Sequence, residues 1–235
     1  MTTEAMPLMG HLRELRDRLA WAAGSVVVLS IVSFFLRDWL LDLIQNPWER
    51  VTDDPLNFFE PAESLSIVMR LSLFGGIVFS TPIWTYHIWA FVSPALTKRE
   101  KKWVVPLILS LTLLFVVGTI FAYWTMPQAL RFLLGFGETF GNTVGVSAYV
   151  NFAIRYLLVF GLAFQYPVFL FAAGAAGLVR TEQLRSVRRY VAFGILVVSA
   201  GVTPGGDPFT LLVLAGPLYV MYELTILAIK YILKK

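Results

Sequence analysis

Two glutamates stand inside dense clusters of basic residues, and their carboxylates are the side chains best suited to bind a ligand. Glu14 lies in the segment HLRELRDRL at residues 11–19, and Glu100 is the sole acid in KREKK at residues 98–102. A carboxylate accepts paired, charge-assisted hydrogen bonds from guanidinium groups, so both residues are candidate sites for a cationic ligand. The pattern alone favours a simpler interpretation, in which Glu14 pairs with Arg18 one helical turn later and Glu100 merely lowers the net positive charge of a basic loop.

Catalytic chemistry has few candidates in this chain. The sequence has no GxxxxGK[ST] phosphate loop and no cysteine, and its two histidines, His11 and His87, stand in no metal-binding motif. We interpret both as polar histidines at a membrane interface. An intramembrane hydrolase would need a base and a nucleophile that the chain scarcely offers. We therefore expect no enzyme activity, no metal and no cofactor.

The composition is that of a polytopic membrane protein. Hydrophobic residues make up 57% of the chain and charged residues 14%, and the mean hydropathy is +0.71. A soluble domain of this size is far less apolar and more charged. The net charge of +4 lies in segments beside apolar runs, where anionic lipid headgroups account for it, so we expect no nucleic-acid partner.

Four clusters of lysine and arginine, separated by pairs of apolar runs, predict the topology. Basic residues in short loops stay on the cytoplasmic side of an inserting protein, so four such segments imply three out-and-back crossings. The sequence therefore predicts an all-α membrane protein with six transmembrane helices and both termini in the cytoplasm. The clusters are Arg13, Arg16 and Arg18; Lys98, Arg99, Lys101 and Lys102; Arg180, Arg185, Arg188 and Arg189; and Lys230, Lys234 and Lys235.

We expect one transmembrane domain over residues 1–235, with an ordered external cap at 37–64. The predicted helices span approximately 19–36, 66–92, 103–124, 152–179, 190–203 and 209–229, with a further short helix near 128–136. Helices five and six are expected to be short, because the turn at 203–208 divides only 40 residues between them. Prolines at 82, 106, 167 and 217 are expected to bend the helices into a concave bundle, with ordinary tolerance of proline in membrane helices as the alternative.

Polar residues inside the apolar runs are further candidates, because ionisable groups in hydrocarbon tend to mark function. Arg70 is expected to pair with Glu63 or Glu60 and so to join the cap to the second span. Gln165 lies next to Pro167 within the fourth span. As an alternative function, a secondary transporter would gather Arg70, Gln165 and Glu223 around a substrate site. The internal repeat typical of such transporters is not evident.

Several blocks of this sequence resemble the TatC family, the multispanning core of the twin-arginine protein translocase. The resemblance covers nearly the whole chain, and its most specific block includes Phe91, Pro94 and Glu100. The blocks are HLRELRDRL at 11–19, FFEPAES at 58–64, STPIWTYHIWAFVSPALTKREKK at 80–102, GLAFQYP at 161–167, the Thr203-Pro turn with Asp207, and the segment from GPLY at 216–219 to YEL at 222–224.

The resemblance implies a receptor for signal peptides that carry two consecutive arginines on folded cargo. In the family, acids at the positions of Glu14 and Glu100 form the cytoplasmic binding site, and the position of Phe91 supports it. Arg16 and Lys98 match basic positions of the same blocks, although positive-inside topology explains them equally well. This resemblance overturns the simpler interpretation of the two glutamates.

The resemblance also implies structural residues, partners and a location. Pro47, Glu63, Arg70, Pro94 and Gln165 are expected to shape the groove and its surroundings. Many family members carry glutamate at the position of Gln165, so a role there that requires a charge is not expected. The implied location is the bacterial cytoplasmic (inner) membrane, and the implied energy source is the proton motive force.

The implied partners are single-span subunits of the TatA and TatB types, which dock near helices five and six. Thr203, Asp207 and Glu223 are candidate contacts, with stabilisation of the turn as the alternative role for the turn residues. The oligomeric state stays open.

Overall fold

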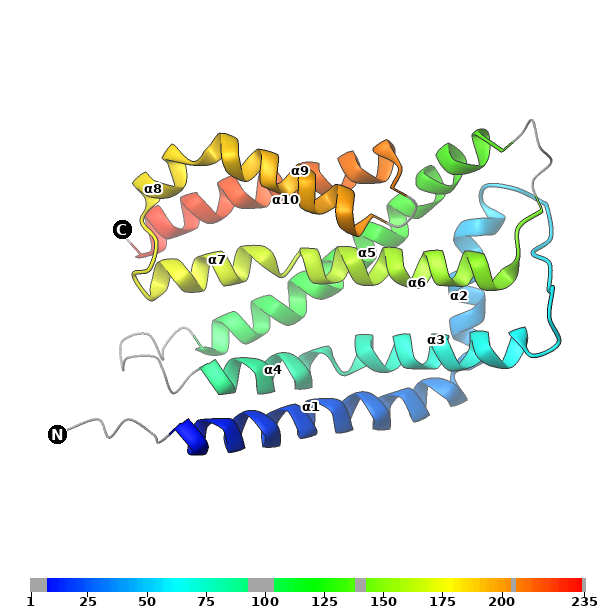
Figure 1. The fold of residues 1–235 in the computed structure, drawn as a ribbon, viewed down its shortest axis with the longest axis horizontal. Helices are drawn as coiled ribbons and strands as arrows, with labels where there is room; N and C mark the ends of the chain where they lie inside the picture. The colour runs from blue at the N-terminus through cyan, green and yellow to red at the C-terminus, as the bar shows by residue number, and fades with distance from the viewer. Residues whose placement is uncertain (1–7, 93–103, 138–142, 204–205, 234–235) are drawn as a thin grey trace.

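The computed structural model describes residues 8–92, 104–137, 143–203 and 206–233, and these are almost entirely helical (Figure 1). A single isolated β-bridge, between Asn57 and Gly145, is found in this part of the chain. The helices are α1 (Leu8–Phe35), α2 (Arg37–Glu49), α3 (Glu63–Phe79), α4 (Thr81–Val92), α5 (Val104–Gly135), α6 (Val146–Ala163), α7 (Tyr166–Ala175), α8 (Thr181–Ser186), α9 (Arg188–Val202) and α10 (Pro208–Ala228), with a π-helical turn at Ile229–Leu233.

Five units in the described part of this fold are long and apolar enough to cross a membrane, and α9 corresponds to the sixth span that the basic clusters predict. Four segments are long and apolar enough by themselves, namely Leu12–Phe35, Val105–Gly135, Val146–Ala175 and Pro208–Leu233. The pair α3 and α4 forms a fifth, bent by 56°. The sixth is α9, whose 15 residues give about 23 Å of helix against roughly 30 Å of hydrocarbon.

Helix ends differ from the predicted spans in several places, and the fourth span begins at Val146 and ends at Ala175 in place of 152 and 179. α1 begins at Leu8, because the polar segment before the apolar run is helical as well. α5 continues to Gly135, so the prediction of a separate helix near 128–136 is wrong. Pro127 lies inside α5 without ending it, since a proline removes a single backbone donor and membrane helices tolerate this loss.

Two of the four prolines mark breaks. The bend between α3 and α4 comes just before Pro82, and α6 gives way to α7 just before Pro167. A proline has no N–H to bond the carbonyl four residues earlier and its ring clashes with that carbonyl, so the helix breaks in the preceding turn and each proline lies in the first turn of the next helix. Pro106 lies in the first turn of α5, and Pro217 lies inside the continuous helix α10.

The bundle has two distinct ends (Figure 1). One end, called here the terminal end, holds the start of α1 and the ends of α4 and α10. α2 and the starts of α3 and α6 lie at the other, called the cap end. Between them α1 runs beside α3 and α4, and α5 crosses the other helices obliquely.

Glycines allow the closest helix contacts. A Cβ added to Gly76 of α3 would lie 2.8 Å from the backbone oxygen of Val26 on α1, and one added to Gly118 of α5 would lie 2.8 Å from that of Phe160 on α6. Small residues let membrane helices approach until backbones touch, which increases their van der Waals contact. These two contacts explain why α1 packs on α3 and α5 on α6.

The cap segment is tied to α6 through hydrogen bonds. The buried hydroxyl of Tyr149 on α6 donates to the Ile44 carbonyl of α2 at 2.5 Å. Within the cap itself, the indole of Trp48 donates to Asp54 O at 2.9 Å. The β-bridge at Asn57 joins the same segment to the start of α6 through backbone hydrogen bonds of 3.0 and 3.1 Å. Pro47 is buried inside α2 next to these contacts. The segment expected to form an ordered cap therefore packs against the bundle.

Candidate functional site

Glu14 lies on the second turn of α1 at the terminal end, and one of its oxygens is already paired. Arg18 donates to Glu14 Oε1 from Nε at 2.8 Å and from Nη2 at 2.5 Å, which is the helical i,i+4 pair expected from the sequence. The side chain of Glu14 is 21% exposed. Its second oxygen, Oε2, is buried and has no hydrogen-bond partner among the described residues. This carboxylate is therefore preorganised by Arg18 and keeps one acceptor for a ligand.

The neighbouring basic residue does not join this pair. Arg16 is 75% exposed and binds Asp17, with Nε and Nη2 at 2.9 and 2.8 Å from Oδ1. Arg16 and Asp17 therefore form a separate surface pair on the same turn of the helix. Surface pairs of this kind contribute little stability.

The other residues of the predicted acidic site come from the end of α4 and the loop after it. Phe91 is half-buried on the last turn of α4, and α4 packs against α1. Glu100, Lys98 and Pro94 lie outside the described residues. The expected approach of Glu100 to Glu14 therefore stays a prediction.

Two buried polar atoms on α4 were not expected from the sequence, which indicated His87 only as an interfacial histidine and gave no role to Trp89. His87 Nδ1 and Trp89 Nε1 are buried without hydrogen-bond partners in the described part of the chain, as is Glu14 Oε2. His87 lies one helical turn before Phe91, so the two share a face of α4. The spacing of His87 and Phe91 was the signal that could have drawn attention to this face.

Gln165 is buried at the break between α6 and α7. Its amide Nε2 donates to the carbonyls of Leu111 and Gly161, at 3.1 and 3.3 Å. Its Oε1 is buried and accepts no hydrogen bond within the described ranges. Gln165 thus joins α5 to the broken span and satisfies a carbonyl of each, which is a structural role that needs no charge.

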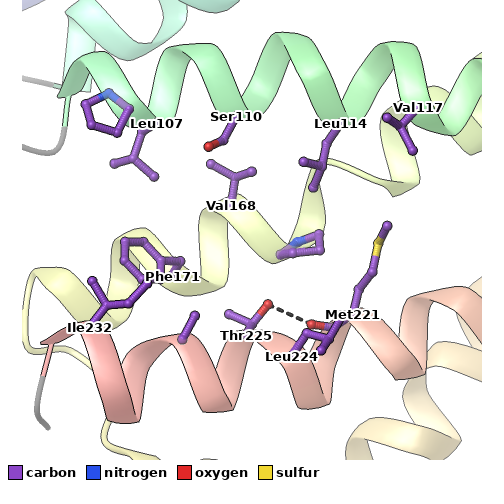
Figure 2. A pocket seen from close by; sticks show the side chains of 13 residues that line it. Leu107, Ser110, Leu114, Val117, Val168, Phe171, Met221, Leu224, Thr225 and Ile232 are labelled. Atoms are coloured by element: carbon purple, nitrogen blue, oxygen red, sulfur yellow. Dashed lines mark hydrogen bonds between the residues drawn. The ribbon is translucent and has the colours of Figure 1, made fainter.

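An apolar groove of about 480 Å³ lies beside this break (Figure 2). Its walls come from α5, α7 and α10, and the lining is almost entirely apolar, with hydroxyls from Ser110 and Thr225. Thr225 Oγ1 donates to its own helix, to the Met221 carbonyl at 2.7 Å. A concave apolar surface is therefore present near Gln165, formed without any residue of α3 or α4.

Glu63 and Arg70 meet the start of α6 at the cap end. Glu63 Oε1 accepts from Ser147 N and Oε2 from Phe59 N, each at 2.8 Å. Arg70 Nη1 donates to Ser147 Oγ at 3.2 Å and to Asn151 Oδ1 at 2.9 Å. No ion pair between Arg70 and an acid appears among the described residues. The expected direct salt bridge is therefore wrong, because both side chains are held by α6.

The three residues considered as partner contacts fall into two places. Thr203 and Asp207 are buried at the turn between α9 and α10, where Asp207 Oδ1 caps α10 by accepting from Thr210 N at 2.7 Å. Glu223 lies toward the other end of α10 and pairs with Arg188 of α9 at 2.6 Å. Sixteen residues of helix separate Asp207 from Glu223, about 24 Å.

The arrangement does not gather the side chains of a transporter. Arg70 contacts the start of α6, Gln165 contacts α5, and Glu223 contacts α9. None of the three contacts another within the part of the chain that the structure describes. No group of three or more metal-binding side chains occurs in those ranges either.

These features define a polytopic all-helical membrane protein with a half-buried acid at its terminal end and an apolar groove between its helices. The chain belongs to the TatC family, because the family model described as Sec-independent protein translocase protein (TatC) matches residues 10–217.

Relatives support the same assignment. The chain is 34% identical to the Sec-independent protein translocase protein TatC of Aquifex aeolicus, covering 94% of this chain and 93% of the relative. It is also 34% identical to that of Frankia casuarinae, covering 94% of this chain but 65% of the longer relative. A crystal structure of the twin arginine translocase receptor TatC in DDM superposes with a TM-score of 0.81 at 34% identity, over 92% of this chain and 98% of the other.

Proposed function

We propose that this chain is the receptor and core subunit of a twin-arginine protein translocase, and that it is not an enzyme. The family, the shared six-helix fold and the acid at the terminal end support this function. In this role the chain binds the signal peptide of a folded cargo protein and organises single-span partner subunits around it. No covalent step is required of its residues.

The observation that carries the proposal is the state of Glu14. Arg18 holds one carboxylate oxygen, while the other is buried and unpartnered among the described residues. A buried acceptor without a donor costs free energy, and a guanidinium group from a signal peptide would supply the donor. We propose that Glu100 binds the second arginine and that Phe91 supports the site. Arg16 and Lys98 would border it.

Arginine suits this role better than lysine. A guanidinium is planar and makes bidentate bonds to a carboxylate, whereas an ammonium acts as a compact point charge. The experiment that tests the function is therefore a binding titration of a signal peptide with Arg-Arg against the same peptide with Lys-Lys. We expect weaker binding of the Lys-Lys peptide, and equal affinity would refute the proposed recognition.

Two glutamates do not account for the whole affinity. Two charge-assisted hydrogen bonds give roughly 3–6 kcal/mol, whereas a micromolar dissociation constant corresponds to about 8 kcal/mol. We propose that the remainder comes from the apolar segment of the signal peptide, lying in the groove between α5, α7 and α10. Photocrosslinkers at Leu114 and Leu224, on two of its walls, should then capture that segment. Capture by lipid alone would refute this placement.

The partner subunits are proposed to pack along α9 and α10. Phe193 and Val197 lie one turn apart on α9 and are 67% and 53% exposed, so they present an apolar face to a single-span helix. Thr203, Asp207 and Glu223 are the polar positions proposed for this contact. Cysteines introduced at Phe193 and Val197 should crosslink to TatA- or TatB-type subunits, while a cysteine at Trp21 on α1 serves as the exposed control.

Both termini are proposed to face the cytoplasm of a bacterium, with the cap outside its inner membrane. The basic residues near the start of α1 and the end of α10, and the acids of the cap, support this orientation. The chain has no cysteine, so single cysteines can be introduced without background. A cysteine at Thr52 should react with an impermeant maleimide in intact cells, whereas one at Asp17 should react after permeabilisation. The reverse pattern would contradict the orientation.

A further inference from the structure

Arg70 lines two cavities at the cap end, one polar and one apolar. It is exposed on α3 and lines a polar cavity of about 640 Å³, together with Glu60, Glu63 and Ser147. It also lines an apolar groove of about 510 Å³ between α1 and α3. A ligand that bound Arg70 would therefore have a polar compartment on one side and an apolar compartment on the other.

The positive charge of Arg70 has no direct counter-charge in the described residues. Its Nη1 donates to Ser147 and Asn151, which are both neutral. The nearby carboxylate of Glu63 is occupied by backbone N–H groups of Phe59 and Ser147. A guanidinium carries five N–H donors, so most of them remain for a ligand. A charged side chain beside lipid-facing surface is costly unless an anion accompanies it.

The apolar groove has the chemistry of a site for an acyl chain. Its walls include Val27, Ile31 and Phe35 of α1 and Met69 and Leu73 of α3, all of them exposed. Among its described lining residues Arg70 alone is charged. A second guanidinium, that of Arg37, lies 5.4 Å from the ring of the wall residue Phe34 and pairs with the exposed Asp38 at 3.5 Å, so Arg70 carries the charge left unpaired in the described ranges. The groove is thus apolar along its length and positive where it opens toward the cap.

The polar cavity also contains a negatively charged side chain, that of Glu60. The carboxylate of Glu60 accepts no hydrogen bond and forms no ion pair in the described part of the chain, although its backbone N–H bonds Glu63. Glu60 and Arg70 line the same cavity. A headgroup that carries both a phosphate and a primary ammonium would satisfy both side chains, because its N–H groups can donate to the Glu60 carboxylate. A purely anionic headgroup would leave Glu60 unpaired, and a choline headgroup has no N–H to donate to it.

We propose that this site binds a phosphatidylethanolamine molecule of the leaflet at the cap end. Its phosphate accepts hydrogen bonds from Arg70, its ammonium pairs with Glu60, and one acyl chain lies in the groove between α1 and α3. The site is independent of Glu14 and of the groove beside Gln165, so it stands whether or not the chain binds signal peptides.

The test is native mass spectrometry of the purified protein, incubated in detergent with equal amounts of phosphatidylethanolamine, phosphatidylglycerol and phosphatidylcholine. We expect one phosphatidylethanolamine to be retained at least fivefold over either other lipid. Arg70→Gln should reduce this retention at least fivefold. The matched control is Arg131→Gln, because Arg131 also lines a polar cavity at the cap end but lines neither of the two apolar grooves described above.

A second variant tests the acyl-chain half without touching the charge. Ile31→Trp fills the groove from an exposed position and should also reduce retention, while leaving the unfolding temperature unchanged. Phosphoethanolamine without acyl chains should not compete at equal concentration. The proposal is overturned by unchanged retention in Arg70→Gln, by equal retention of the three lipids, by retention in Ile31→Trp equal to that of the unmodified protein, or by competition from free phosphoethanolamine.

Discussion

The two ends of the bundle satisfy their polar groups in different ways. At the cap end, side chains distant in sequence are joined by hydrogen bonds, as in the contacts of Tyr149 with Ile44 and of Arg70 with Asn151. At the terminal end, Glu14 Oε2, His87 Nδ1 and Trp89 Nε1 are buried without partners in the described residues. Buried polar atoms without partners cost free energy that a ligand can recover. Helices are joined at the terminal end too, where Tyr222 on α10 donates to the Leu184 carbonyl at 2.6 Å, and the three unpartnered atoms named above belong to α1 and α4. The comparison indicates a fixed cap end and, on α1 and α4, a side of the terminal end prepared for binding.

The largest effect on stability is expected when a buried contact at the cap end is removed. Tyr149→Ala removes a side chain that is 2% exposed, so we expect a loss of about 3–5 kcal/mol in the free energy of unfolding, measured by denaturation in detergent. Tyr149→Phe keeps the ring and loses the hydrogen bond to Ile44, at a cost of about 1 kcal/mol. Equal stability of Tyr149→Ala and the unmodified protein would mean that the cap end is not the fixed end.

The next effect concerns binding at the terminal end. Glu14→Ala should weaken binding of an Arg-Arg signal peptide by about ten- to a hundredfold, because it removes the charged acceptor for a guanidinium. The same loss is expected for Glu100→Ala. Isothermal titration with purified protein measures both.

The matched control for Glu14 is Asp17→Asn. Asp17 is an acid on the same helix, is 60% exposed, and pairs with Arg16. We expect its substitution to leave peptide affinity unchanged. If Asp17→Asn weakened binding as much as Glu14→Ala, general charge and not the Glu14 site would explain the affinity.

A smaller effect is expected at the turn between α9 and α10. Asp207→Ala removes the cap of α10 and should lower the free energy of unfolding by about 1 kcal/mol, whereas Asp207→Ser should restore most of it. The same variants should be tested for crosslinking of a single-span subunit at Phe193. If crosslinking were lost in both variants while stability returned in Asp207→Ser, Asp207 would act mainly as a partner contact.

The smallest effect is expected for the ion pair between α9 and α10. Arg188 and Glu223 are 43% and 31% exposed, so solvent and salt screen their attraction. Glu223→Gln should cost less than about 1 kcal/mol of stability, with the difference falling as salt is raised. A cost of several kcal/mol would show that the terminal end is held as tightly as the cap end and would weaken the comparison.

The membrane class and the number of spans were predictable because they depend on composition and on the order of basic and apolar segments. The pairing of Glu14 with Arg18 was equally accessible, since residues four apart on a helix are neighbours. The hydrogen-bond partners of Arg70 were not predictable from the sequence. Ser147 and Asn151 lie more than 70 residues further along the chain, and no local pattern relates them to Arg70.

The sequence by itself determined that this chain is a helical bundle in a membrane and that Glu14 stands among basic residues, because hydropathy and charge act locally along the chain. Tertiary structure decided which oxygen of Glu14 is left for a ligand, which helices form the apolar groove, and that Arg70 and Glu63 are held by α6 and not by each other. These outcomes depend on how closely the helices approach, and that distance is set by packing between segments far apart in the chain.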